Sequence, residues 1–186
     1  MDPTKLLEAD HRKVEDLFAR IEAAEGDART PLVRELEENL KAHMALEEEV
    51  VYPAMEPVTG AEAVEEGNKE HELARKTLAE MIALAPDEPG FGGALEAVKA
   101  GIEHHVEEEE GEVFPKLRKE APELLREMAT PFMHKRVELG MPFDASSLAD
   151  ASTKEELLEE AKNAGIEGVS SMTKEELAES LVTAMS

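Results

Sequence analysis

The fold is decided by a pattern that occurs twice: His43-Met-Ala-Leu-Glu-Glu-Glu-Val-Val-Tyr-Pro53 and His105-Val-Glu-Glu-Glu-Glu-Gly-Glu-Val-Phe-Pro115. Both stretches read H-x3-E-E-x2-V-[YF]-P. A histidine and a glutamate four residues apart share one face of an α-helix. One such pair is weak evidence in a chain so rich in glutamate. Two pairs in a matching frame, each preceded by another histidine (His11 and His71), predict a repeated functional site.

Apolar residues with helical spacing surround these histidines and glutamates. The stripes are Leu7, Val14, Phe18 and Ile21 around His11; Val33, Leu36, Leu40, Val50 and Val51 around His43 and Glu47; Val64, Leu78 and Ile82 around His71; and Leu95, Val98, Ile102 and Val113 around His105 and Glu109. Four histidines and two glutamates are therefore expected to face the core.

Signals for helix starts and ends divide the first part of the chain into four segments of similar length. The segments begin near Pro3, near Thr30 and Pro31, near Gly60, and near Gly92 and Gly93. Because the connections are short, consecutive helices should run antiparallel. The predicted fold class is all-α: an up-down-up-down four-helix bundle with a small C-terminal helix-extended-helix module. A short fifth helix is expected after Pro122.

The six polar residues are also expected at one height in the bundle. With a rise of about 1.5 Å per residue, they lie roughly 20 to 25 Å from the loops at one end. A lone histidine on an apolar face is usually a satisfied core residue, but a buried carboxylate needs a cation or hydrogen-bond donors. The stripes offer no Lys or Arg. Four imidazoles and two carboxylates exceed one tetrahedral zinc site and suit two metals, iron or manganese before others.

The bulk composition limits the other function classes. The 186 residues include no cysteine, which excludes thiolate metal sites, iron–sulfur clusters and disulfides. The formal charge of −24 disfavours binding to nucleic acid or anionic membranes. No segment has the length and hydrophobicity of a membrane span, and Met1–Asp10 lacks the pattern of a signal peptide. The protein is expected to be cytoplasmic.

Changes in composition divide the chain into three parts: the bundle at 1–135, a linker at 136–152, and a helical module at 153–186. Within the linker, residues Gly140–Ser152 contain Gly, Pro, Asp and Ser with little apolar periodicity. In the module, Thr153-Lys-Glu-Glu156 and Thr173-Lys-Glu-Glu176 each predict a capping box at a helix start.

With these motifs, residues 1 to about 134 resemble the hemerythrin-like HHE cation-binding family, in the order H, H-x3-E, H, H-x3-E. The resemblance implies two non-haem iron ions joined by bridging carboxylates and an oxo or hydroxo bridge, with Mn or Zn as substitutes. It implies dioxygen, peroxide or nitric oxide as the small-molecule partner, and it puts Tyr52 and Phe114 near the pocket wall. The implied metal ligands are His11, His43, Glu47, His71, His105 and Glu109, with Glu47 and Glu109 as the bridges.

One position departs from the oxygen-carrying members, which have a second histidine one turn after the third-helix ligand. Here that position is Arg75. Glu48 or Glu70 could complete the coordination. The departure favours peroxide chemistry of a catalase-like kind, or redox sensing, over reversible oxygen carriage. The alternative is an iron- or oxygen-responsive regulatory protein without turnover.

Two further histidines are assigned outside the site. His104 projects about 100° from the ligand stripe, although the spacing alone leaves an exchange with His105 open. His134 follows Pro131 beyond the four helices and is expected to have a surface or packing role.

The tail from Thr153 resembles the helix-extended-helix module at the N-terminus of transcription terminator Rho, related in shape to SAP domains. Many relatives carry basic residues in the central stretch, where this chain has Val169, Ser170 and Ser171. Nine acidic residues and three lysines from Ser146 onward also oppose binding to a phosphate backbone. Docking to a protein partner, or a solubilising role, is favoured over nucleic-acid binding. The oligomeric state is left open.

Overall fold

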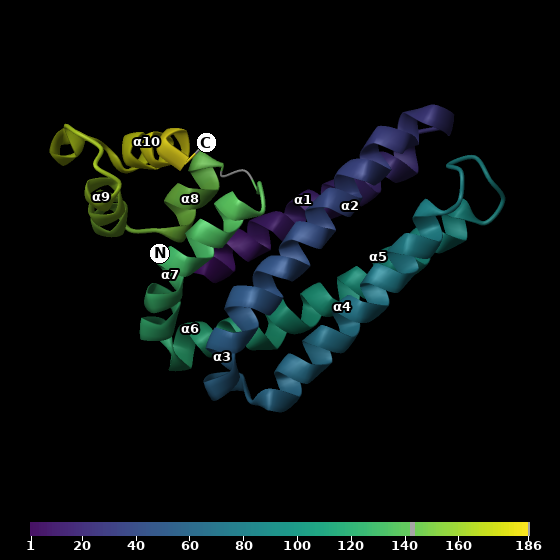
Figure 1. The fold of residues 1–186 in the computed structure, drawn as a ribbon, viewed down its shortest axis with the longest axis horizontal. Helices are drawn as coiled ribbons and strands as arrows, with labels where there is room; N and C mark the ends of the chain where they lie inside the picture. The colour runs from purple at the N-terminus through teal and green to yellow at the C-terminus, as the bar shows by residue number, and fades with distance from the viewer. Residues whose placement is uncertain (142–143, 186) are drawn as a thin grey trace.

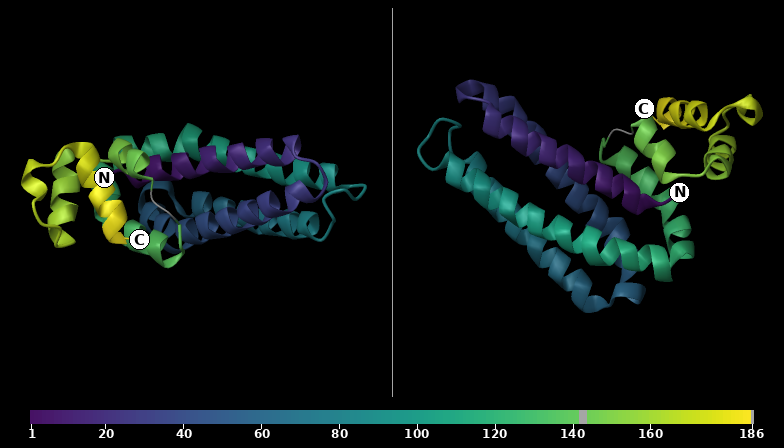
Figure 2. Two further views of the ribbon diagram at one scale, coloured as in Figure 1. Left: turned by 90° about the horizontal axis from the view of Figure 1, so that it is seen from above. Right: turned by 180° about the vertical axis from the view of Figure 1, so that it is seen from behind.

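A computed structural model describes residues 1–141 and 144–185, and these residues form helices and connecting turns without a β-strand. The prediction of an all-α fold is confirmed. The four long helices are α1 (Pro3–Ala23), α2 (Arg29–Leu46), α4 (Ala61–Ile82) and α5 (Phe91–Glu108). Helix α1 packs beside α2 and α4 beside α5, and consecutive long helices are joined at alternating ends (Figures 1 and 2).

Local sequence explains where these helices begin. Asp2 caps α1 by accepting a hydrogen bond from the backbone N–H of Thr4 at 3.0 Å, and Pro3 occupies the first turn, where its missing N–H costs nothing. Gly60 and Gly90 precede α4 and α5 with φ values of 95° and 107°. Side chains with a Cβ rarely adopt these values, so glycine suits both turns.

The two H-x3-E-E motifs have a local geometry that their spacing did not predict. Residues Glu47–Val51 and Glu109–Val113 form π-helical turns, which join α2 to α3 (Tyr52–Thr59) and α5 to α6 (Phe114–Glu120). Pro53 and Pro115 lie two residues after the ends of these turns. Proline cannot donate to the carbonyl four residues back, so a wider turn is expected there.

The polar layer divides the apolar core into two clusters. One cluster lies toward the α1–α2 and α4–α5 loops and includes Phe18, Leu36, Leu78 and Leu95. The other includes Leu7, Val51, Tyr52 and Phe114, and it continues into the C-terminal helices. The predicted stripes are buried or half-buried in these clusters except at Ile82, which is 36% exposed while Met81 is buried. Either residue could follow Leu78 by one turn, and the helix places Met81 inward.

The C-terminal part is more regular than the sequence indicated. Helix α7 spans Pro122–Glu138 and α8 spans Ala145–Ala151. The expected linker at 136–152 is therefore helical over much of its length, while residues 142 and 143 lie outside the described residues. Asp144 caps α8 through the N–H of Ser147 at 2.9 Å. A helix of seven residues, about two turns, is too short to show clear apolar periodicity in sequence, although it buries Leu148 against the core.

The remaining helices are α9 (Lys154–Asn163) and α10 (Lys174–Met185). Both predicted capping boxes are present: the N–H of Thr153 donates to Glu156 at 2.8 Å, and the N–H of Thr173 donates to Glu176 at 2.7 Å. Leu157, Leu177 and Leu181 join the core cluster that contains α7. The division into separate domains and the likeness of the tail to the Rho module stay predictions.

The packing of α8 can be tested by replacing Leu148, which is 1% exposed, with alanine. Leu148→Ala should lower the free energy of unfolding by roughly 2–5 kcal/mol, because truncating a buried leucine leaves a cavity. The measurement is chemical denaturation followed by circular dichroism. Asp150→Ala, an exposed change in the same helix, is the control and should have little effect. Equal, small effects of both changes would mean that 145–151 is a linker.

Candidate metal centre

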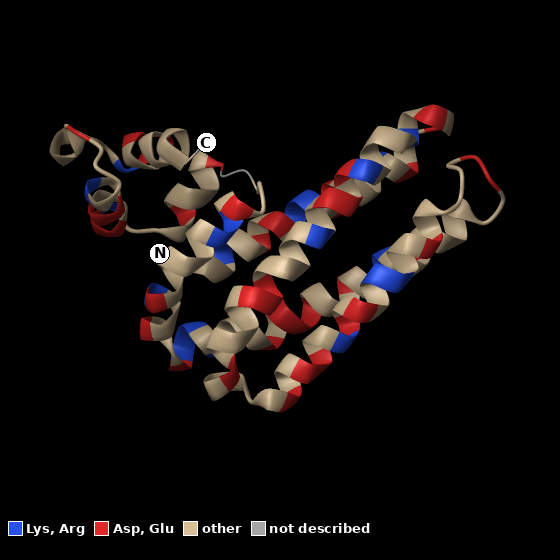
Figure 3. Ribbon diagram, viewed as in Figure 1, with Lys and Arg blue, Asp and Glu red and all other residues tan. Residues whose placement is uncertain are grey.

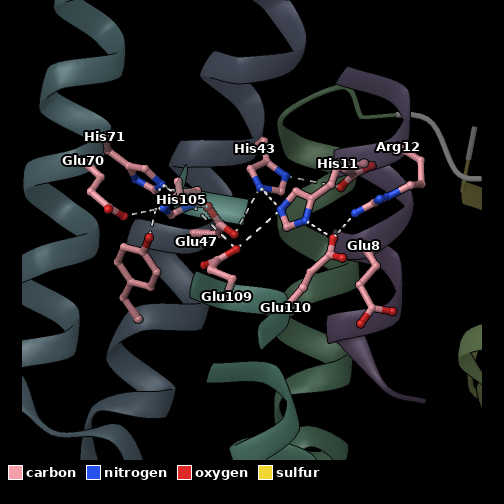
Figure 4. A network of polar contacts seen from close by, with 12 residues as sticks. Glu8, His11, Arg12, His43, Glu47, Glu70, His71, His105, Glu109 and Glu110 are labelled. Atoms are coloured by element: carbon pink, nitrogen blue, oxygen red, sulfur yellow. Dashed lines mark hydrogen bonds and ion pairs between the residues drawn. The ribbon is translucent and has the colours of Figure 1, made fainter. Parts of the chain in front are cut away.

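The structure brings together all six residues that the sequence singled out (Figure 4). They come from the four long helices and the two π-helical turns. Their exposed fractions are small: His11 3%, His43 5%, Glu47 0%, His71 1%, His105 5% and Glu109 4%. By contrast, the side chain of His104 is 64% exposed, and His134 is exposed on α7. The matching frame therefore identified the inward member of the His104–His105 pair.

One half of the centre is built by His11 and His43. Their Nε2 atoms lie 3.1 Å apart. Glu47 Oε1 lies 3.1 Å from Nε2 of His43, and Glu109 Oε2 lies 3.5 Å from Nε2 of His11. These four side chains offer nitrogen and oxygen atoms within 4.8 Å of one another, which is a geometry that could hold a metal ion.

The other half repeats this arrangement with His71 and His105, whose Nε2 atoms lie 3.3 Å apart. Glu47 Oε2 lies 3.2 Å from Nε2 of His71, and Glu109 Oε2 lies 3.6 Å from Nε2 of His105. The two oxygens of Glu47 thus face different histidine pairs. Glu47 is the residue common to both potential metal positions.

A second ring of carboxylates lies on the outer side of the imidazoles. Glu110 contacts Nδ1 of His11 at 2.8 Å, Glu48 contacts Nδ1 of His71 at 2.9 Å, and Glu70 contacts Nδ1 of His105 at 2.8 Å. An acceptor at Nδ1 fixes the tautomer in which Nε2 is free to bind a metal. Glu48 and Glu70, considered from sequence as extra ligands, occupy this outer role.

The fourth imidazole differs, because Asp10 lies 3.7 Å from Nδ1 of His43, beyond hydrogen-bond distance. Sequence reasoning did not identify Asp10 or Glu110 as partners. Two signals were available: the second glutamate of each H-x3-E-E motif, and the acidic residue directly before each isolated histidine, Asp10 and Glu70. Their role depends on which side of the ring each carboxylate reaches, which spacing does not specify.

The carboxylates control protonation when no metal is present. Burial disfavours the imidazolium of His43, but Glu47 and Asp10 outweigh burial and raise its pKa to about 10. Burial also disfavours the imidazolium of His105, but the nearby carboxylates of Glu109, Glu47 and Glu70 raise its pKa to about 11. Burial raises the pKa of Glu47, and the neighbouring histidines, led by His43, lower it well below its usual value. Protons on the imidazoles therefore compensate the buried carboxylates.

Hydrogen bonds alone do not satisfy the centre. Among the described residues, the two oxygens of Glu47 and Oε2 of Glu109 have no partner with hydrogen-bond geometry, and their nearest polar neighbours are the histidine Nε2 atoms, 3.1 Å and 3.2 Å from Glu47. Buried carboxylate oxygens without donors are costly unless a cation is nearby. The converging Nε2 and carboxylate oxygen atoms are the ligand types preferred by first-row transition metals, so these residues fit a metal-binding role.

Two aromatic residues border the centre, as the resemblance implied. The hydroxyl of Tyr52 donates to Nε2 of His71 at 3.2 Å. Phe114, in the corresponding place of the other motif, stacks on His11 with ring centroids 6.0 Å apart. Arg75 points outward and donates to Glu48 at 2.7 Å. A groove of about 640 Å³ between α1 and α5 reaches His11 and is lined by Phe18 and Ile102.

Acidic residues are spread along the long helices (Figure 3). None of the helices among the described residues has the length and apolar character needed to span a bilayer.

Metal uptake should release protons. At pH 8 an ordinary histidine is neutral, whereas the raised pKa values of His43 and His105 keep both protonated in the metal-free protein. A metal must displace protons from these rings, so binding should weaken as the pH falls. Titration with Fe(II) in weakly buffered, anaerobic solution at pH 8 should acidify the sample. Binding without proton release would contradict this charge balance.

Comparisons with known proteins agree with this geometry. The profile of the Hemerythrin HHE cation binding domain matches residues 2–117. An uncharacterized hemerythrin-like protein of Schizosaccharomyces pombe is 30% identical over 118 residues, 61% of this chain and 58% of that protein. A DNA nickase of Nostoc sp. is 25% identical over 134 residues, 71% of this chain and 38% of that protein.

The chain spans less than two thirds of the length of either relative. No solved structure matches it significantly. The family match covers more than half of the residues and includes all six clustered side chains. This chain belongs to the hemerythrin HHE cation-binding domain family.

Proposed function

We propose that the four long helices form an up-down-up-down bundle around two non-haem iron ions, and that the protein reacts with or senses dioxygen, peroxide or nitric oxide. The observation that carries this proposal is the position of Glu47, whose two oxygens lie 3.1 Å and 3.2 Å from Nε2 atoms of two different histidine pairs. A bidentate carboxylate between two nitrogen sets is the arrangement expected of a bridge. His11, His43, His71, His105 and Glu109 would complete the ligand set.

Iron held by these residues would supply one-electron redox chemistry and Lewis acidity toward a small oxidant. The protein's own contribution begins with access. The groove between α1 and α5 reaches His11 between apolar side chains such as Phe18 and charged ones such as Arg12 and Glu107, and it would admit a small molecule. Glu48, Glu70 and Glu110 hold the imidazoles in place through Nδ1.

Tyr52 is placed to donate a proton or hydrogen bond at the centre. Burial, followed by the negative charge of Glu47 and Glu109, raises the pKa of its hydroxyl above the usual value. Tyr52 therefore stays protonated at neutral pH. If Nε2 of His71 held a metal, the hydroxyl would lose this acceptor at 3.2 Å and would be free to donate to a small molecule at the centre.

Arg75 supports reaction or sensing over reversible carriage. It takes the position of a histidine found in oxygen carriers, and its guanidinium is held by Glu48 outside the centre. The second histidine pair thus receives no additional nitrogen from this position, which leaves room for a small molecule. We propose catalase-like peroxide removal or redox sensing.

The first test is metal content combined with substitution of the shared carboxylate. Purified protein should contain close to two irons per chain, and Glu47→Ala should lose most of this iron because both positions share that residue. Glu49→Ala removes an exposed carboxylate of the same π-helical turn that pairs with Lys135 of α7 and not with a histidine, and it should keep the metal. Inductively coupled plasma mass spectrometry gives the result. Unchanged iron content in Glu47→Ala would rule out the bridge.

Tyr52→Phe tests the proton donor without removing a ligand. Iron content should stay the same, since the equivalent position of the other motif is already Phe114. Oxidation of the reduced protein by peroxide should slow roughly a hundredfold, the scale of general acid catalysis. Stopped-flow absorption under anaerobic conditions measures the rate. An unchanged rate would exclude Tyr52 from the reaction.

The second candidate is an iron- or oxygen-responsive binding protein without turnover. It is favoured by the position of the polar layer between two apolar clusters, because metal binding there would stabilise both. A sensor would show strong metal-dependent exchange protection and little peroxide turnover. The name of the Nostoc relative suggests action on DNA, but this chain covers only 38% of that protein and carries a charge of −24, so nucleic acid is not the favoured partner.

A further inference from the structure

The two halves of the centre are related by sequence and by contacts, which makes their differences informative. Glu48 and Glu110 correspond, as do Glu70 and Asp10, each pair approaching Nδ1 of an equivalent histidine. Beside Glu70 lies the exposed His104, 3.5 Å away. Beside Asp10 lies a buried arginine from a different helix. The halves therefore differ in what stands behind the outer carboxylate.

That arginine is Arg136 of α7, which is only 4% exposed. Its Nη2 donates to Asp10 Oδ1 at 3.0 Å, and its Nη1 donates to Oδ2 of the same carboxylate. The guanidinium also lies 5.7 Å from the ring centroid of Phe132. Two-point pairing fixes both the position and the orientation of a carboxylate. Arg136 thus holds Asp10 beside His43.

Arg136 lies outside the part of the chain that matches the family. The family match ends at residue 117, so α7 lies beyond it. The backbone carbonyl of Arg136 accepts from the N–H of Met141 at 2.9 Å, and Phe132 and Met141 belong to the same core cluster as residues of α8, α9 and α10. Helix α7 also meets the other motif through Lys135, which pairs with the exposed Glu49 at 2.6 Å. Within α7, Arg136 is the residue that pairs with a carboxylate beside a histidine of the centre, so it joins the C-terminal helices to the His11–His43 half.

We propose that Arg136 is a positioning residue for the His11–His43 metal position, and that it couples metal binding there to the docking of α7 and the helices behind it. This inference rests on the proposed metal centre and adds its regulation. When Nε2 of His43 binds a metal, the ring proton stays on Nδ1. Asp10, 3.7 Å away, is the carboxylate placed to accept a hydrogen bond from that N–H if the two groups move closer. Each arrangement stabilises the other, so metal should tighten α7 and docked α7 should tighten the metal.

The test uses the full chain and Fe(II) under anaerobic conditions, with Co(II) as a spectroscopic probe. Single-position backgrounds separate the halves: His105→Ala keeps the first position and His43→Ala keeps the second. Arg136→Gln should weaken metal binding about tenfold in the first background, the lower end of the effect of losing an outer partner. It should leave binding in the second background unchanged.

Arg118→Gln is the matched control. Arg118 also joins two helices through carboxylates, donating to Asp2 at 3.0 Å and Glu8 at 2.7 Å, but neither carboxylate contacts a histidine of the centre. This variant should leave both metal positions unchanged. If Arg136→Gln does not fold, Arg136→Lys retains the charge without two-point pairing and should weaken the first position alone, by a smaller factor.

Hydrogen exchange provides a readout independent of reactivity. Metal should slow amide exchange in residues 122–138 of the wild-type protein, and Arg136→Gln should abolish that slowing. Equal loss at both positions, unchanged binding, or tighter binding in Arg136→Gln would each overturn the proposal. Two bound metals with unchanged exchange of α7 would overturn the coupling alone. A wild-type chain that bound no metal would overturn the di-iron function itself, and the coupling with it.

Discussion

The structure depends on two carboxylates buried in the middle of an otherwise apolar bundle. Glu47 is fully buried and Glu109 nearly so, and within the described residues their ion-pair partners are histidines rather than lysine or arginine. Such a charge is stable only with a cation beside it. In the metal-free chain, protons on the imidazoles take this role, as the raised pKa values of His43 and His105 indicate. The carboxylates that need a cation in the apolar core are therefore also groups that could hold a metal.

This constraint also explains why the sequence was informative. A glutamate on an apolar stripe is so unfavourable that its presence marks a site, and the two motifs located Glu47 and Glu109 without any structure. The stripes predicted the burial of His11 and His71 for the same reason. Periodicity depends only on local geometry, so it predicts which face of a helix a residue occupies.

What sequence could not supply depends on contacts between distant segments. The outer partner of His11 is Glu110 and that of His105 is Glu70, and only the packed helices decide which nitrogen of each ring these carboxylates reach. The π-helical turns at Glu47–Val51 and Glu109–Val113 were also missed, although Pro53 and Pro115 were a signal. Sequence alone assigned residues 136–152 to a linker. That segment includes Arg136, at the end of α7, and all of α8, whose apolar periodicity is weak.

The repeated halves show how one fold can make two similar positions unequal. A shared ligand set gives both halves the same inner atoms, so differences must come from the residues around them. Tyr52 and Phe114 occupy equivalent positions of the two motifs, so only the half that contains His71 has a tyrosine hydroxyl at the centre. Asp10 is held by a buried arginine, whereas Glu70 meets the exposed His104. The hydroxyl and the arginine belong to opposite halves, so the proposed proton donor and the proposed coupling to the C-terminal helices lie on different histidine pairs, and the groove between α1 and α5 opens at the pair behind which Arg136 lies.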